Sequence, residues 1–220
     1  MRRNTFLAAS TCACAMLMLG PGAALAGSLD QQQVNADAGP LEISSNISRA
    51  QTFTAGLSGN LDEIDLHVGK LGSPSANLRV EIRAVLGGIP AATVLASTEL
   101  PPSAVPFDFF VPIPLTPAVP LTPGTEYAIV AYSATSPAPA NVYQWYRGSG
   151  ADPYPAGREF QSFASPPAAW MGNNADLAFK TYVAPFRPTG RRAAALKKCK
   201  KKHSRKKRKK CRKKATKLPV

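Results

Sequence analysis

The sequence predicts an all-β fold: an antiparallel β-sandwich, jelly-roll-like, with a barrel as the alternative, followed by a disordered basic C-terminal tail. Apolar and polar side chains alternate over residues 61–68 and 78–85, as they do in strands of a sheet with one wet face. Gly, Pro, Asn and Ser separate these and further short runs, which is typical of sandwiches and barrels. Residues 27–186 show no long helical period.

The expected strands follow one another at short intervals. They cover residues 50–55, 61–68, 78–85, 93–100, 107–113, 126–133, 142–147 and 177–183. Residues 126–133 are apolar on both faces, which favours a central strand. The polar, turn-rich residues 27–48 are expected to form a leading strand or arm. Prolines gather between residues 101 and 120 and predict an irregular edge, because proline cannot donate a hydrogen bond to a neighbouring strand.

The first 26 residues have the pattern of an export signal. An Arg-Arg pair follows the initial Met, residues 6–19 form an apolar stretch, and Ala24-Leu25-Ala26 is a small-residue cleavage site. Cleavage there leaves a mature chain that begins at Gly27. The apolar stretch is too short to cross a membrane, and no later stretch is long enough. The sequence therefore predicts a secreted or cell-envelope-associated protein without a transmembrane segment in the mature chain.

The formal net charge of +14 is distributed very unevenly. Residues 27–186 contain 7 basic residues and all 13 acidic ones, whereas residues 187–220 contain 18 Lys or Arg and no acid. The chain therefore divides into a signal peptide (1–26), a β-sandwich domain (27–186) and a Lys/Arg-rich tail (187–220). Because the tail has no apolar face to offset the entropy of ordering, we expect it to be disordered.

Such a basic tail is expected to bind polyanions by displacing their counterions. The residues expected to do so are Lys197, Lys198, Lys200, Lys201, Lys202, Arg205, Lys206, Lys207, Arg208, Lys209, Lys210, Arg212, Lys213 and Lys214. The expected partner is an anionic cell-wall polymer or polysaccharide; an anionic lipid surface and extracellular DNA are the alternatives. In an oxidising compartment Cys199 and Cys211 can pair with each other or across molecules.

The best ligand candidates in the β domain are aromatic. Tyr143, Trp145 and Arg147 share one face of an expected strand. Tyr154 and Trp170 lie in the Gly- and Pro-rich loops that follow. Aromatic faces stack on the apolar faces of sugar rings, so these five residues form a candidate glycan site. The competing and preferred interpretation is that Trp145 and Trp170 fill the core, because aromatic side chains dominate core energetics.

No group of residues indicates catalysis, and we predict that the protein is not an enzyme. The mature chain has two histidines, His67 and His203, and His67 is expected on the wet face of a strand. Nothing selects an acid pair of the kind a glycosidase uses from Glu63, Glu81, Glu99, Glu126 and Glu159.

No cofactor is expected either. Cys199, His203 and Cys211 are too few for a closed zinc site, and the surrounding positive charge opposes a cation. A structural calcium ion is the one alternative, and it would use oxygen ligands. Its candidate ligands are Asp62, Asp65 and Asp152.

Several segments between about residues 30 and 183 carry a family resemblance. They are Ala50–Gly56, Leu61–Leu66, Leu78–Arg83, Gly88–Pro90, Val94–Ala96, Gly124–Val130, Asp152–Tyr154 and Asp176–Val183. This pattern resembles an uncharacterised bacterial secreted β-sandwich domain, like choice-of-anchor and carbohydrate-binding-module-like surface domains. The tail is similar to Lys/Arg-rich tails of actinobacterial exported proteins. The resemblance implies a fold and an envelope setting, and it transfers no ligand and no catalytic residue.

Together these features predict a non-enzymatic, exported, envelope-associated binding or adhesion protein, in which a β-sandwich carries a polyanion-binding tail. Two alternatives remain. One is a secreted polysaccharide hydrolase, and the other is a protein that binds extracellular nucleic acid through the tail.

Overall fold

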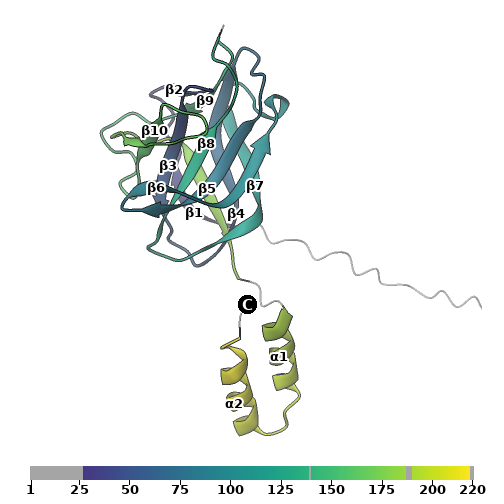
Figure 1. Cartoon of the computed structure of the whole chain (residues 1–220). Helices are drawn as coiled ribbons and strands as arrows, with labels where there is room; N and C mark the ends of the chain where they lie inside the picture. Colours follow the sequence, from purple (N-terminus) through teal and green to yellow (C-terminus); the bar gives the residue numbers. More distant parts are fainter. Residues whose placement is uncertain (1–26, 139, 187–189, 219–220) are drawn as a thin grey trace, which may run out of the picture.

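The computed structural model describes residues 27–138, 140–186 and 190–218. The expected signal peptide, residues 1–26, lies outside this part. Two antiparallel six-stranded sheets form the β domain (Figure 1). The all-β prediction is therefore confirmed, while the jelly-roll assignment stays a prediction.

The first sheet is organised around β4. In spatial order it contains β1 (Ser28–Gln33), β12 (Phe179–Ala184), β4 (Gly59–Leu71), β9 (Val142–Tyr146) and β2 (Pro40–Ile43), and β7 (Phe109–Leu121) also pairs with β4. One edge of β4 pairs with β12 as far as Leu66 and with β9 from Val68 onward. The other edge pairs with β7 from Gly59 to Val68. The expected leading arm supplies β1 and β2.

The second sheet has β8 near its middle. Its order is β11 (Met171–Gly172), β10 (Glu159–Ser162), β3 (Ser48–Thr54), β8 (Glu126–Tyr132), β5 (Leu78–Leu86) and β6 (Ile89–Leu100). A short 3-10 helix, Pro102–Ala104, follows β6. As predicted for a central strand, β8 is buried on both faces. Ile129 and Ala131 join the main core, while Ala128 and Val130 join a second cluster on the other face.

The main core lies between the two sheets. Ile64, Leu66 and Trp145 enter it from the first sheet, and Phe53, Ile82 and Ile129 enter it from the second; all six side chains are fully buried. On β5 Leu78, Val80 and Ile82 lie in this core as expected, but Glu81 and Arg83 on the opposite face are buried too, so that face is not the wet one that the sequence predicts.

The prolines gather in β7, which carries Pro112, Pro114, Pro117 and Pro120. Among the described strands β7 pairs with β4 alone, with a register shift opposite Leu61 and Glu63. This is the irregular edge that the prolines predict, because an edge strand tolerates missing N–H donors.

The tail prediction is wrong for the described residues, because they form two helices, α1 (Gly190–Lys200) and α2 (Arg205–Ala215). The physical reason is a disulfide between Cys199 and Cys211, which joins the helices into a hairpin. Lys, Arg and Ala are also strong helix formers. No helix in the described part of the chain is long and apolar enough to cross a membrane.

Phe53 offers a test of the packed core. Its ring stacks on Tyr127 at 5.9 Å and lies 6.1 Å from Phe179, measured between ring centroids. Phe53→Ala is expected to lower the free energy of unfolding by about 3–5 kcal/mol, because it removes buried apolar area and leaves a cavity. Urea unfolding measures the change. Phe163→Ala is the matched control, since Phe163 is 68% exposed, and equal losses in both variants would contradict the assignment of the core.

Candidate functional site

The aromatic residues of the candidate glycan site are mostly part of the core. Tyr143 and Trp145 are fully buried. The Trp145 indole N–H donates to the Ala178 carbonyl at 2.9 Å, and the Tyr143 hydroxyl donates to the Ala76 carbonyl at 2.7 Å. Burial raises the pKa of Tyr143 to about 12. Neither ring presents a face on which a sugar could stack.

The other three residues, Tyr154, Arg147 and Trp170, do not form an exposed surface on which a sugar ring could stack. Tyr154 is buried, packs edge-on against Phe179 and donates its hydroxyl hydrogen bond to Gln31. Arg147 is half-buried, and Trp170 packs against the second cluster together with Phe160. The five residues are therefore not gathered on one exposed surface, which favours the interpretation that Trp145 fills the core, and the glycan site stays a prediction.

His67 is held by aromatic rings and a carboxylate. Its Nε2 lies 2.5 Å from Asp108 Oδ1, and its ring stacks on Tyr146 at 4.9 Å and lies 4.7 Å from Phe110. Among the described residues no serine hydroxyl is hydrogen-bonded to His67. This geometry lacks the nucleophile that a Ser-His-Asp mechanism requires.

Two of the five glutamates considered for catalysis are buried and paired with arginine. Glu159 Oε1 accepts from Arg49 at 2.9 Å. Glu81 accepts from Arg79, Arg83 and the Tyr132 hydroxyl at 2.7–2.9 Å. Burial alone would raise the pKa of Glu81, but these hydrogen bonds outweigh it and the pKa is lowered. Glu81 has both of its carboxylate oxygens hydrogen-bonded, whereas Glu159 Oε2 is buried without a hydrogen-bond partner among the described residues. The pairing of both residues with arginine suits a structural role.

One carboxylate pair lines a small hollow of about 320 Å³, formed by Asp152, Asp176 and neighbouring loop residues. Burial raises the pKa of Asp176, and Asp152 adds to the rise. Both oxygens of Asp176 are already engaged, Oδ1 by Gln51 at 2.8 Å and Oδ2 by the Tyr154 N–H at 3.0 Å. Asp176 thereby anchors the loop that contains Tyr154. In the described part of the chain no three His, Cys, Asp or Glu residues gather as metal ligands.

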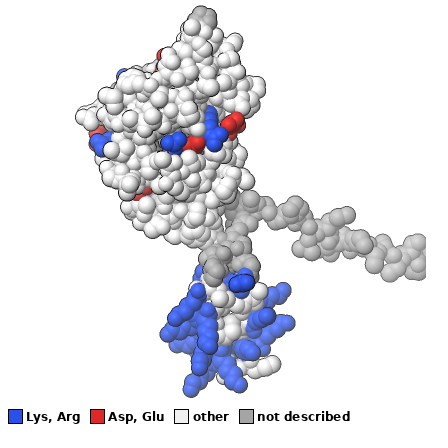
Figure 2. Space-filling model, viewed as in Figure 1, with Lys and Arg blue, Asp and Glu red and all other residues white. Residues whose placement is uncertain are grey.

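The highest density of positive charge lies in the helical hairpin formed by α1 and α2. All fourteen Lys and Arg residues expected to bind polyanions lie in its helices or in the turn between them, and every one is exposed. Figure 2 shows an almost continuous positive surface here, whereas the visible face of the β domain carries few charges. Residues 190–218 contain no acid, so the hairpin has no carboxylate of its own to neutralise this charge.

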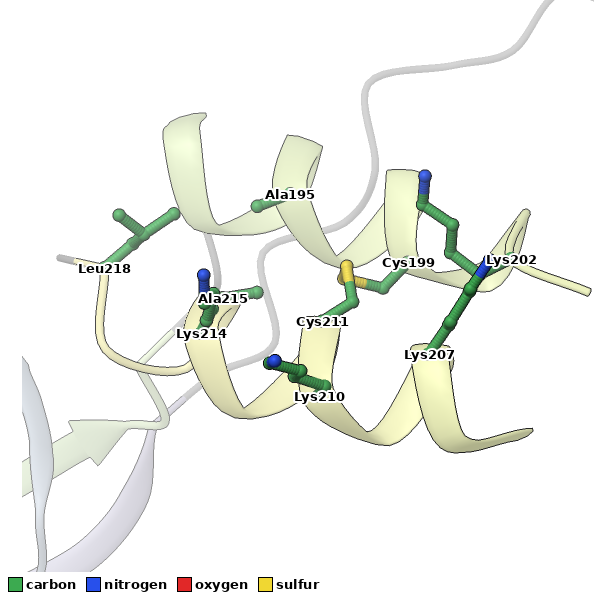
Figure 3. A pocket seen from close by; sticks show the side chains of 9 residues that line it. All are labelled: Ala195, Cys199, Lys202, Lys207, Lys210, Cys211, Lys214, Ala215 and Leu218. Carbon is green, nitrogen blue, oxygen red and sulfur yellow. A yellow bond between two sulfur atoms is a disulfide. The ribbon is translucent and has the colours of Figure 1, made fainter. Parts of the chain in front are cut away.

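The disulfide sits between the helices and leaves two different basic surfaces. Cys199 is buried, and the two cysteine Cα atoms are 5.5 Å apart. Around the disulfide lies a hollow of about 460 Å³. Its lining consists of Ala195, Cys199, Lys202, Lys207, Lys210, Cys211, Lys214, Ala215 and Leu218 (Figure 3). The hollow has an apolar floor with ammonium groups around it.

The second surface is a groove lined entirely by cations. Arg205, Arg208, Lys209 and Arg212 enclose about 540 Å³. Their spacing places them on one face of α2. We call these four residues the arginine face. A guanidinium presents a planar fork of donors that matches phosphate and carboxylate groups, so this face is suited to bind anions.

No family model, curated protein or solved structure matches this chain. The family resemblance therefore stays an expectation.

The cysteine pair is the signal that sequence reasoning undervalued. Two cysteines 12 residues apart, separated by helix formers and a Ser-containing turn, can close a helical hairpin. The dense charge and the missing apolar face predict disorder only if the cysteines stay unpaired. Intramolecular pairing was one of the two arrangements that the sequence left open.

The glutamate at position 81 predicts a pH dependence. Its folded-state pKa lies below the ordinary value of a glutamate, so its stabilising contribution is complete above the unfolded pKa and is lost as pH falls through the folded pKa. Glu81→Gln is expected to lower the free energy of unfolding at pH 7 by about 3–5 kcal/mol, because Arg83 then lacks its buried partner. Unfolding measured between pH 7 and pH 3 should show a shallower acid loss in the variant. Glu126→Gln is the control, and identical profiles for wild type and Glu81→Gln would contradict the assignment.

The disulfide predicts a redox-dependent helix content. Each helix has 11 residues, and isolated helices shorter than about 12–15 residues are marginal in water. Like charges at helical spacing weaken them further. Reduction, or Cys199→Ser, is therefore expected to remove most of the helical far-UV circular dichroism signal while the β signal remains. Ala194→Ser controls for a small polar substitution in α1. Helix content that is unchanged after reduction would show that the disulfide is not needed.

Proposed function

We propose that this chain is a non-enzymatic, exported binding protein that is held at the cell envelope by its basic hairpin. The partner is an anionic, phosphate-bearing wall polymer. The observation that carries the proposal is the arginine face, three guanidinium groups and one ammonium that share a groove on α2.

The charge balance of the hairpin supports this proposal. Its exposed cations have no carboxylate partner within residues 190–218, so at low salt they hold mobile anions. A polymer with regularly spaced phosphates releases those ions and its own counterions on binding, which makes association favourable and salt-dependent.

The residue types favour phosphate over a neutral sugar. Arg205, Arg208 and Arg212 can each offer two parallel N–H donors to one phosphate group. Of the aromatic residues expected to stack on sugar rings, Tyr143, Trp145 and Tyr154 are buried in the β domain. The hairpin is therefore the better candidate for the contact with the envelope. Its binding would hold the attached β domain at the cell envelope.

The proposal predicts which charges matter most. Arg205, Arg208, Lys209 and Arg212, changed together to Gln, should weaken co-sedimentation with purified cell walls more than the same change at Lys202, Lys207, Lys210 and Lys214. Both variants remove four charges, so they differ in the face that is altered and in whether guanidinium or ammonium groups are lost. In a salt series the arginine-face variant should also lower the steepness of log K against log salt by about 3–4, if all four residues contact phosphate.

Three further probes separate the alternatives: duplex DNA, vesicles containing an anionic phospholipid, and an insoluble neutral polysaccharide. Binding to walls that neither quadruple variant weakens would refute the hairpin as the anchor. Tighter binding to DNA than to walls at the same salt would favour the nucleic-acid alternative. Turnover of a polysaccharide by the wild-type chain would favour the hydrolase alternative.

A further inference from the structure

One carboxylate oxygen in the first sheet is buried without a partner. Asp62 lies on β4, and its Oδ1 has no hydrogen-bond partner among the described residues and is shielded from solvent. Leaving a buried acceptor unsatisfied is unfavourable, and more so when it carries charge. This oxygen therefore indicates that a donor is missing.

Gly27 lies directly against that oxygen. A Cβ atom built on Gly27 would be 2.6 Å from Asp62 Oδ1, 2.8 Å from the Val183 nitrogen and 2.9 Å from the Tyr182 carbonyl carbon. The Gly27 Cα therefore occupies a slot between Asp62 and β12 that accepts no side chain. The Gly27 nitrogen is bonded to this same Cα, so bond geometry keeps it within about 5 Å of Oδ1, although its N–H forms no hydrogen bond with that oxygen.

The surroundings of this slot are negatively charged. Glu63 and Asp65 are on the same strand as Asp62, and burial together with these two aspartates raises the pKa of Glu63. Lys180 lies 3.7 Å from Asp65, and the Tyr182 hydroxyl donates to the same carboxylate. No cation of the described residues forms an ion pair with Asp62. A positive charge placed at Gly27 would complement this group.

We propose that the chain is processed between Ala26 and Gly27 and that the new α-ammonium of Gly27 pairs with Asp62. A leader peptidase would supply the reaction, in which water adds across the peptide bond. The bond from the Ala26 carbonyl carbon to the Gly27 nitrogen breaks, Ala26 leaves as a carboxylate, and the Gly27 amine takes up a proton at neutral pH. A neutral amide with one N–H thus becomes an ammonium with three.

This pairing gives processing a structural consequence. The new ion pair joins the start of the mature chain to β4, next to the point where β1 pairs with β12. Glycine at position 27 serves two purposes, because it is a small residue after the cleavage site and the residue that fits the slot. The proposal concerns the β domain and the export signal, so it does not depend on what the hairpin binds.

The first experiment is to export the full 220-residue precursor from a bacterial host and to determine the amino terminus of the released protein. Gly27 is expected. Release with an amino terminus at any other residue would overturn the proposal.

The second experiment compares a chain that begins at Gly27 with one that retains Ala26, both ending at Val220. The chain that begins at Gly27 is expected to melt about 2–4 °C higher at pH 7. Pairing raises the pKa of the α-amino group, so the difference should be complete below its unpaired value of about 7.7–8.0 and should close as pH rises through the paired value.

Asp62→Asn made in both chains decides whether Asp62 is the partner. This substitution is expected to abolish the difference in melting temperature between the chains. Asp65→Asn is the matched control on the same strand and should leave the difference intact. Equal melting of the two wild-type chains, or a difference that persists in Asp62→Asn, would overturn the proposal. Wall co-sedimentation of the same proteins reports on the hairpin separately.

Discussion

The architecture depends on β4 more than on any other strand. One of its edges pairs with β12 and then β9, and its other edge pairs with β7. Its inward residues Ile64, Leu66 and Val68 are fully buried in the main core. Because the strand is anchored on both edges and one face, its remaining face is held rigidly. This explains how Asp62 can keep an unpaired oxygen near Gly27 without rearranging.

The β domain and the hairpin handle charge in opposite ways. In the β domain, arginine side chains enclose the buried glutamates, as at Glu81 and Glu159. Truncating one partner of such a pair is strongly unfavourable, although the intact pair itself adds little net stability. In the hairpin the cations face solvent and lack any carboxylate on the same element. Their mutual repulsion is relieved only by counterions or by a bound polyanion, which is why we propose the hairpin as the binding surface.

Most of the fold and the basic residues of the hairpin could be predicted from the sequence, but the helical geometry of the hairpin could not. Strands with one apolar face, such as β5, can be recognised because apolar and polar residues alternate in the sequence. The strand β8 can be recognised because it is apolar on both faces. The strands β10 and β11 have 4 and 2 residues, too few to show a period. Trp145 was ambiguous because the same ring suits a core or a sugar, and only burial decides. The hairpin was missed because two cysteines, not an apolar face, hold its helices together.

The disulfide also affects how the basic residues of the hairpin can bind a polyanion. A disordered chain must lose conformational entropy when it binds, whereas a hairpin closed by Cys199 and Cys211 already holds its arginines at fixed helical spacing. That preorganisation favours tighter binding for the same number of contacts. It also ties the site to its surroundings, since such a disulfide persists in an oxidising compartment and is rare in a reducing one. If the chain is exported as we propose, the disulfide that fixes the arginine face forms only after the chain has left the cytoplasm.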